Sequence, residues 1–423
     1  MNEEYFRLQS LHVQGYKILK DFVLDSIGPL TVIVGPNGCG KTALWEVITL
    51  FPDLMKVHPS LDIDTYMYQI FYPHRSHMGF DGVVHPQSQG VSIELGLRLG
   101  NRPYTYKLRF NQGSPWPLPG VADTVFEKLT SQEKVLLCYE GRRDYETLSP
   151  QDITPKKYKA SVNDQEIEVS WPHLHPLLVL DAPNDELAKD ELFRKVREYF
   201  KSWRGFKPAF IHLLAKGGQN LDAHLITPGE RFPGEWLDVP MGNLPQVLFR
   251  LKEQNHDKFE EIEEIFLVAI DSPYDTLSVY QESYQIKVFL GRANKPNELW
   301  LADWPDGWKA FLSWLVALRT APPGAVIYLE EPENNLHPRL LAQLLEQIRL
   351  ANQRGIQVFI STHSMELVNL IEPHELVLME NGQAHRVDGE KARYIREAGI
   401  LLGSAWVEGI LEDIAKPPAA TSQ

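Results

Sequence analysis

The chain has 423 residues, which at about 100–200 residues per domain allows two or three structural units. Its content of 43% hydrophobic and 23% charged residues is ordinary for a globular protein and excludes wholesale disorder. Asp and Glu number 56 against 42 Lys and Arg, so the net charge of −14 argues against a generally basic nucleic-acid coat. A local basic groove is compatible with this balance.

Two cysteines, Cys39 and Cys138, are too few for a disulfide framework or a four-thiolate metal site. Residues 1–4 are acidic and do not start the basic and apolar pattern of a secretory signal. The apolar tract Phe311–Leu318 is stopped by Arg319 and is too short to span a bilayer. We therefore expect a cytoplasmic protein that makes no membrane contact.

The first fifty residues predict strands, a glycine-rich turn and a helix. Leu30–Val34 is a continuous apolar run rich in β-branched residues, which is typical of a strand buried on both faces of a parallel sheet. Strands are also expected at Leu8–Val13 and Phe22–Leu24, and the composition of Thr42–Leu50 favours a helix. Residues 51–90 show little periodicity, so loops and short helices are expected there.

Alternating apolar and polar residues continue the strand pattern after residue 90. Val91–Leu99 and Tyr104–Phe110 flank a short polar turn and predict a hairpin. Further strands are expected at Lys134–Tyr139, Ile167–Trp171 and Leu177–Leu180. Between residues 185 and 269 apolar residues recur at helical spacing, for example at Leu244, Val247, Leu248 and Leu251.

The last third of the chain returns to alternating strands and helices. Strands are expected at Leu277–Val279, Gln285–Leu290, Val326–Leu329 and Val358–Ile360. Helices are expected at Trp308–Leu318, Pro338–Ala351 and Ala392–Ile414. This order predicts an α/β fold that is interrupted by a helical lobe.

A phosphate-loop pattern follows the first buried strand and comprises Gly35, Pro36, Asn37, Gly38, Cys39, Gly40, Lys41 and Thr42. Its glycines permit backbone dihedral angles that aim successive N–H groups at phosphate oxygens, and the next helix adds its positive dipole end. Lys41 can reach the β- and γ-phosphates of ATP, and the Thr42 hydroxyl can bind Mg²⁺. The required context, a buried strand before the loop and a helix after it, is present.

Two carboxylates end the apolar strand at Val326–Leu329. A carboxylate there can hold hydrated Mg²⁺ beside the phosphate loop, and its neighbour can polarise an attacking water. We assign Glu330 to the metal and Glu331 to the water. A Glu-Glu pair after a strand is by itself more often the start of a solvated helix, so this assignment depends on the phosphate loop.

Two further segments lie where additional phosphate contacts are expected. His363 follows the strand at 358–360, and its imidazole can hydrogen-bond a γ-phosphate. Asp306 and Gly307 form a turn one helix upstream of Glu330, where a second phosphate-contacting element is expected. As a purely structural feature, Asp306 is a candidate helix cap.

Together these elements resemble the ABC-type ATPase head, and more narrowly the SMC/RecF-like group that includes the OLD-type ATPases of bacteria. Gly35–Thr42 resembles its Walker A motif, and Val326–Pro338, with Glu-Glu-Pro-Glu and Leu-His-Pro, resembles its Walker B motif and D-loop. Thr362-His363-Ser364 matches its H-switch, and Gly242-Asn243-Leu244 resembles the opening of its second lobe. The resemblance spans nearly the whole chain.

The resemblance implies an α/β fold in which a P-loop NTPase sheet carries an antiparallel β subdomain and an inserted helical lobe. We expect residues 1–182 to hold Walker A and the β subdomain, and residues 183–272 to form the helical lobe. Residues 273–415 then hold the signature-like turn, Walker B, the D-loop and the H-switch, and residues 416–423 form a flexible tail.

The sequence departs from the family pattern at three points. Pro305 stands where the signature usually offers a Ser hydroxyl to the partner's γ-phosphate, which leaves Asp306 and Gly307 for that contact. Glu330 replaces the commoner Asp and keeps its charge on a longer arm. The Q-loop glutamine has no distinctive context, and its candidates are Gln69, Gln87 and Gln89.

The resemblance further implies an ATPase that uses ATP and Mg²⁺, with Lys41, Glu331 and His363 as catalytic residues. Two copies would sandwich two nucleotides, with Asp306 and Gly307 of one copy facing the phosphate loop of the other. Stand-alone ATPases of this type resemble components of prokaryotic anti-phage systems that control a separate effector. The stretch after His363 is too short for the nuclease domain that is fused to OLD proteins.

A RecF-like DNA-binding ATPase of repair or replication is the alternative. It predicts a basic stripe to which the hairpin residues Arg98, Arg102, Lys107 and Arg109 contribute, although the same residues also suit a solvated hairpin face. A transporter subunit is disfavoured by the Glu-Glu-Pro-Glu motif and the missing LSGGQ-type signature. A small-molecule kinase is disfavoured because it lacks the H-switch histidine.

Overall fold

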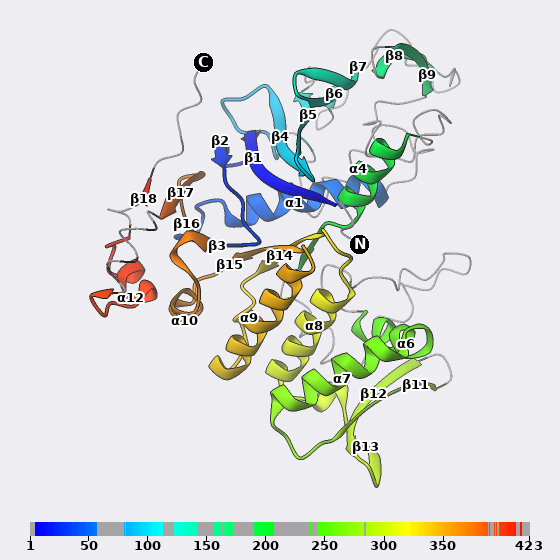
Figure 1. The fold of residues 1–423 in the computed structure, drawn as a ribbon, viewed down its shortest axis with the longest axis vertical. Helices are drawn as coiled ribbons and strands as arrows, with labels where there is room; N and C mark the ends of the chain where they lie inside the picture. The colour runs from blue at the N-terminus through cyan, green and yellow to red at the C-terminus, as the bar shows by residue number, and fades with distance from the viewer. Residues whose placement is uncertain are drawn as a thin grey trace.

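Three β-sheets and the helices packed on them form the part of the chain that the computed structural model describes (Figure 1). The described residues are 5–56, 80, 82–112, 122–142, 156–162, 165–171, 190–206, 237, 243–282, 285–387, 389, 393, 395, 397–411 and 415–416. The strand expected at Leu177–Leu180 lies outside them. Within the described residues, no helix combines the length and apolar character that crossing a membrane requires.

A seven-stranded sheet holds the C-terminal strands of the chain together with one strand from its start. The strand order is β10-β14-β15-β3-β16-β17-β18. The first five strands are parallel, and β17 and β18 add antiparallel at one edge. Their bounds are Arg204–Phe206 for β10, Val326–Glu330 for β14, Gln357–Ser361 for β15, Leu30–Val34 for β3, Leu376–Glu380 for β16, Gln383–Val387 for β17 and Ala415–Lys416 for β18.

Helices cover both faces of this sheet, which explains the continuous apolar sequence of its central strands. On β3, Ile33 faces the core that contains α1 (Lys41–Lys56) and α4 (Glu191–Lys201). Val32 and Val34 face the opposite core, which contains α8 (Asp306–Thr320) and α9 (Pro338–Gln353). Figure 1 shows α1 on one side of the sheet and α8 and α9 on the other.

An eight-stranded antiparallel sheet packs beyond α1, in the order β2-β1-β4-β5-β6-β7-β8-β9. Buried and exposed residues alternate along β1 and β4, as expected for a sheet with one face on a core. The hairpin expected at residues 91–110 is confirmed as β4 and β5. The bounds are Phe6–Tyr16 for β1, Leu19–Leu24 for β2, Gly90–Leu99 for β4, Arg102–Gln112 for β5, Ala122–Ser131 for β6, Lys134–Arg142 for β7, Lys156–Val162 for β8 and Gln165–Trp171 for β9.

A smaller lobe packs along α8 and against α9 (Figure 1). It consists of α6 (Leu244–Gln254), α7 (His256–Ile270) and a three-stranded antiparallel sheet. The strands of that sheet are β11 (Thr276–Glu282), β12 (Gln285–Arg292) and β13 (Lys295–Trp300). The lobe expected over residues 183–272 therefore differs in part, because α4 contacts α1 and β10 joins the seven-stranded sheet.

Short elements complete the C-terminal part of the fold. They are the 3₁₀ turns Leu301–Asp303 and Pro373–Glu375 and the helices α10 (Met365–Asn369) and α12 (Leu402–Val407). The single helix expected over Ala392–Ile414 is wrong, because Gly399 takes a positive φ of 81° and α12 begins only after it. Ala415 and Lys416 pair with β17, so the sheet extends across the expected start of the tail.

Candidate functional site

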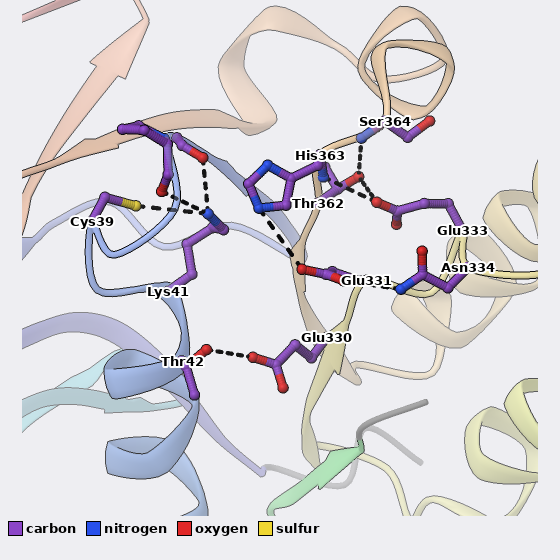
Figure 2. A network of polar contacts seen from close by, with 12 residues as sticks. Cys39, Lys41, Thr42, Glu330, Glu331, Glu333, Asn334, Thr362, His363 and Ser364 are labelled. Atoms are coloured by element: carbon purple, nitrogen blue, oxygen red, sulfur yellow. Dashed lines mark hydrogen bonds and ion pairs between the residues drawn. The ribbon is translucent and has the colours of Figure 1, made fainter. Parts of the chain in front are cut away.

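The residues singled out in the sequence converge at one edge of the seven-stranded sheet. β3, β15 and β14 are neighbours and parallel, so their carboxyl ends meet at this edge. The phosphate loop follows β3, the two glutamates end β14, and His363 follows β15. Figure 2 shows Lys41, Thr42, Glu330, Glu331 and His363 around one space.

The phosphate loop is folded so that its lysine is buried. The Lys41 ammonium donates hydrogen bonds to the carbonyl oxygens of Gly35 (2.8 Å) and Pro36 (3.1 Å) and lies 3.8 Å from Cys39 Sγ. Because an ammonium has three donors on a flexible stem, these weak neutral acceptors can be exchanged for phosphate oxygens. The loop therefore keeps a cation ready where a nucleotide's phosphates would lie.

Two turns from other parts of the chain support this loop. A Cβ on Gly35 would lie 2.1 Å from the Met379 carbonyl oxygen of β16, so only glycine fits there. The Gly382 N–H, in the turn between β16 and β17, donates to the Cys39 carbonyl oxygen at 2.9 Å. On the other side, a Cβ on Gly40 would touch Ile18 of the β1–β2 turn. The loop is thus held on both flanks while its Gly38 faces open space.

Tyr328 connects the Walker B strand to the start of α1. Its hydroxyl donates to the Lys41 carbonyl oxygen at 3.2 Å, and the side chain is fully buried between the two elements. Burial raises the pKa of Tyr328 well above its usual range, so the phenol remains a neutral donor. This contact fixes the distance between β14 and α1, on which the two halves of the site depend.

Thr42 and Glu330 form the oxygen pair that suits a magnesium ion. The Thr42 hydroxyl donates to Glu330 Oε1 at 2.7 Å (Figure 2). Mg²⁺ is usually held by one or two protein oxygens and completes its shell with water and phosphate oxygens. The donor set therefore fits Mg²⁺ that arrives with a nucleotide.

Glu331 takes a backbone conformation that is rare for a side chain of its size. Its φ is 47°, and its N–H donates to the Ser361 carbonyl oxygen at 2.8 Å, which holds the turn in place. Its carboxylate accepts a hydrogen bond from Asn334 Nδ2 at 2.9 Å and lies 3.8 Å from His363 Nε2. Both side chains are 37% exposed, so the pair is open to a ligand.

Glu333 was not assigned a role from the sequence, yet it joins the two strand ends. Its Oε1 accepts hydrogen bonds from the Thr362 hydroxyl (2.6 Å) and from the His363 N–H (3.0 Å). In the sequence, Glu333 is visible only as the last acidic residue of Glu-Glu-Pro-Glu. Its hydrogen-bond partners lie about thirty positions further along the chain, so no local pattern indicates them.

The signature-like turn lies against the D-loop of the same chain. A Cβ on Gly307 would lie 2.6 Å from the Asn335 carbonyl oxygen, so glycine is required for this close approach. The expectation that Asp306 caps the helix is wrong, because Pro305 is the N-cap and Asp306 is the first helical residue. The Asp306 carboxylate instead pairs with the buried Lys309 ammonium at 3.2 Å.

The remaining candidates that the structure describes lie on or beside the antiparallel sheet. Gln69 and Gly242 are outside the described residues, and Gln87 accepts a hydrogen bond from Lys20 beside the antiparallel sheet. Gln89 is exposed just before β4. The hairpin cations lie on the antiparallel sheet, where Lys107 pairs with Glu94 at 3.1 Å. Arg98 and Arg109 bond nearby oxygens and Arg102 is exposed.

The fold and this site define a P-loop ATPase of the ABC and SMC type. Residues 30–369 match the protein family described as "AAA domain, putative AbiEii toxin, Type IV TA system". This match covers most of the chain, from β3 to α10, and the chain belongs to that family.

Comparisons with single proteins give shorter or more distant matches. A "Putative ABC transporter ATP-binding protein" of Methanosarcina acetivorans is 32% identical over 100 residues, which are 23% of this chain and 34% of that protein. The chain thus matches about a third of the length of this relative.

Solved structures of SMC heads are similar in outline. "SMC head domain from Thermotoga maritima" has a TM-score of 0.42 and 11% identity and covers 89% of this chain and 97% of that one. An Smc head "bound to the C-terminal domain of ScpA derived from Pyrococcus furiosus" has a TM-score of 0.47 and 12% identity, with coverages of 93% and 99%.

Proposed function

We propose that the protein is a Mg²⁺-dependent ATPase that works as a nucleotide-driven dimerisation switch. The observation that carries this proposal is the convergence of Thr42, Glu330, Glu331 and His363 at one sheet edge. The Thr42–Glu330 pair is 2.7 Å apart and the Glu331–His363 pair 3.8 Å apart. We assign the first pair to metal binding and the second to acid–base chemistry beside the phosphate loop.

Each side chain has a distinct part in this reaction. Lys41 leaves the carbonyl oxygens of Gly35 and Pro36 to bind phosphate oxygens, and Thr42 and Glu330 would hold Mg²⁺, which neutralises developing charge. Glu331, whose carboxylate is partly exposed, accepts the proton of an attacking water. His363 donates a hydrogen bond to the terminal phosphate.

The exposure and charge of the signature-like turn, Asp306 and Gly307, support dimerisation. Asp306 is 51% exposed, and Asn334 and Asn335 of the D-loop are exposed beside Gly307. The ammonium of Lys309 offsets the charge of Asp306, so this turn can approach the phosphates of a partner chain. The first helical N–H groups of α8 then offer donors to those phosphates, since Pro305 has none.

The test of the switch is the mass of Glu331→Gln in solution, measured by light scattering with and without Mg²⁺-ATP. This variant keeps the binding residues but loses the base, so ATP should hold two chains together and the mass should double. ADP should leave one chain. A mass that does not respond to ATP would contradict the switch.

We further propose that the protein is the ATPase subunit of a cytoplasmic anti-phage system that controls a separate effector. The family description names a toxin of a Type IV TA system, which supports a role in a defence system made of separate proteins. Co-purification from a cell that carries the neighbouring genes is the test. An effector that binds the ATP-trapped Glu331→Gln dimer differently from the wild type is expected, and a chain that purifies alone in both states would contradict this role.

The alternative function, a DNA-binding ATPase, has one observation in its favour. On the outer face of the antiparallel sheet, Arg7 lies directly opposite Arg98, and Lys107 lies directly opposite Lys128. Lys107 also pairs with Glu94 at 3.1 Å, but the facing arginines carry like charges that repel each other, so a polyanion over this face would relieve that repulsion. Duplex DNA binding that needs Mg²⁺-ATP, weakens steeply with salt and is lost in Arg98→Glu with Lys128→Glu would favour this function over the first.

A further inference from the structure

Glu333 contacts both the hydroxyl and the backbone of the segment that carries His363. The His363 N–H and the Thr362 hydroxyl both donate to the same carboxylate oxygen, Oε1, at 3.0 and 2.6 Å (Figure 2). Hydrogen bonds to an ionised carboxylate are shorter and stronger than neutral ones. The position of the His363 main chain therefore depends on a residue that is separated from Glu331 by a single proline.

The rest of the segment is held by one backbone hydrogen bond to the sheet and by one hydrogen bond within the segment. The Thr362 N–H donates to the Ile33 carbonyl oxygen of β3 at 3.1 Å, and the Ser364 N–H donates to the Thr362 hydroxyl at 2.9 Å. The first of these bonds fixes the segment toward β3. The bonds to Glu333 fix it in a different direction, toward the D-loop and so toward Glu331.

The two hydrogen bonds to the His363 segment use only one carboxylate oxygen of Glu333, Oε1. Oε2 is buried and has no hydrogen-bond partner among the described residues. A buried oxygen without a donor is unfavourable, so packing alone does not explain a glutamate at this position. The contact with the His363 segment is made through the single acceptor Oε1.

We propose that Glu333 is a positioning residue that holds His363 at the distance from Glu331 that hydrolysis requires. This inference rests on the proposed ATPase function. Glu333 also starts the D-loop, since the Leu336 N–H donates to its carbonyl oxygen and Asn335 lies against Gly307. Glu333 therefore connects the D-loop to the segment that carries His363.

The test compares Glu333→Ala with Glu333→Gln by single-turnover hydrolysis of Mg²⁺-ATP and by the Kd for Mg²⁺-ATP. Glu333→Ala loses both bonds and should slow hydrolysis at least about tenfold with a Kd within about threefold of wild type. Glu333→Gln keeps one acceptor oxygen and should stay within about threefold of the wild-type rate. Glu346→Ala, on the exposed face of α9, is the matched control and should leave the rate unchanged.

The effect of Glu333→Ala on hydrolysis in a chain that already lacks His363 distinguishes a positioning role from other roles of Glu333. In His363→Ala, the additional change Glu333→Ala should slow hydrolysis less than about twofold, because the residue it positions is already absent. If Glu333→Ala does not fold, Thr362→Val loosens the same contact from the other side and should give a smaller loss. Glu333→Gln should then still match the wild type.

The outcomes distinguish this inference from the proposed function. A wild type that does not hydrolyse Mg²⁺-ATP would contradict both the proposed function and this inference. With an active wild type, three results overturn this inference alone. They are a Glu333→Ala rate equal to wild type, a Glu333→Gln loss as large as that of Glu333→Ala, and an equal loss in the His363→Ala background.

Discussion

Gly35 and Gly38 belong to the same phosphate loop but have different surroundings. Gly35 is packed so closely on β16 that a Cβ would lie 2.1 Å from the Met379 carbonyl oxygen. Gly38 has a φ of 78°, and a Cβ at this position would have no described atom within 4 Å. The first glycine is required for space, and the second only for its backbone conformation.

These surroundings predict different costs for the same substitution. Gly38→Ala should lower the free energy of unfolding by about 1 kcal/mol, which is the order of the penalty for a left-handed backbone. Gly35→Ala must also move β16 or the loop, so its loss should exceed about 2 kcal/mol. Urea unfolding of the two variants measures this difference. Equal losses would show that β16 does not constrain the loop.

At this scale, the sequence predicted the residues that a motif defines and missed those defined by a distant contact. Lys41, Thr42 and Glu331 could be proposed from the sequence because their spacing and flanking elements are local. Glu333 has partners about thirty positions away, as its bonds to residues 362 and 363 show, so no local pattern marks it. The alternative interpretation of Asp306 as a helix cap was wrong, because Pro305 is the N-cap and the Asp306 carboxylate pairs with Lys309.

The junction of α7 and β11 contains a partly buried carboxylate. Glu263 Oε1 accepts a hydrogen bond from the Leu277 N–H at 2.6 Å, which ties the helix to the start of the strand. Burial raises the pKa of Glu263 above its ordinary value of 4.5, although this hydrogen bond and Lys252 oppose the shift. The charged form is therefore less favourable in the folded lobe than in the unfolded chain.

This shift predicts how the lobe responds to pH. Because the folded pKa is raised, the stability linked to Glu263 is present below the ordinary pKa and is lost as pH rises through the folded pKa. Glu263→Gln keeps the acceptor without the charge, so its thermal midpoint should exceed that of the wild type at about pH 7. The difference should shrink at about pH 4, where the wild-type carboxyl is protonated.

Glu264→Gln is the matched control, because Glu264 is the next residue on α7 and is exposed. Its thermal midpoint should follow the wild type at both pH values. A Glu263→Gln variant that is less stable than the wild type at neutral pH would contradict a burial-raised pKa.

The elements that could be predicted were those with a strong local pattern. β3 and β14 are continuous apolar runs, and α9 has apolar residues at helical spacing. β10 has only three residues and is a strand only because β14 pairs with it. β16 and β17 were missed although Asn381-Gly382 joins them with positive φ at both residues, which is a hairpin signal.

The seven-stranded sheet, whose carboxyl-end edge carries the proposed nucleotide site, lies between two cores that are built from distant parts of the chain. One core joins α1, α4 and the antiparallel sheet, and the other joins α6 to α9 with the three-stranded sheet. The α/β class followed from the order of motifs. The exact borders of the inserted lobe could not be predicted from the sequence. α4 packs on α1 in the first core and β10 pairs with β14 in the main sheet, and both partners lie far away in the sequence.

The central claim is that Lys41, Glu330, Glu331 and His363 act on one Mg²⁺-bound ATP. Rapid-quench hydrolysis of Mg²⁺-ATP by the wild type, Lys41→Ala and Glu331→Gln tests it most directly. The wild type should release phosphate, Glu331→Gln should bind ATP and retain it uncleaved, and Lys41→Ala should bind it at least about tenfold more weakly. Hydrolysis by Glu331→Gln at the wild-type rate, or none by the wild type, would contradict the account.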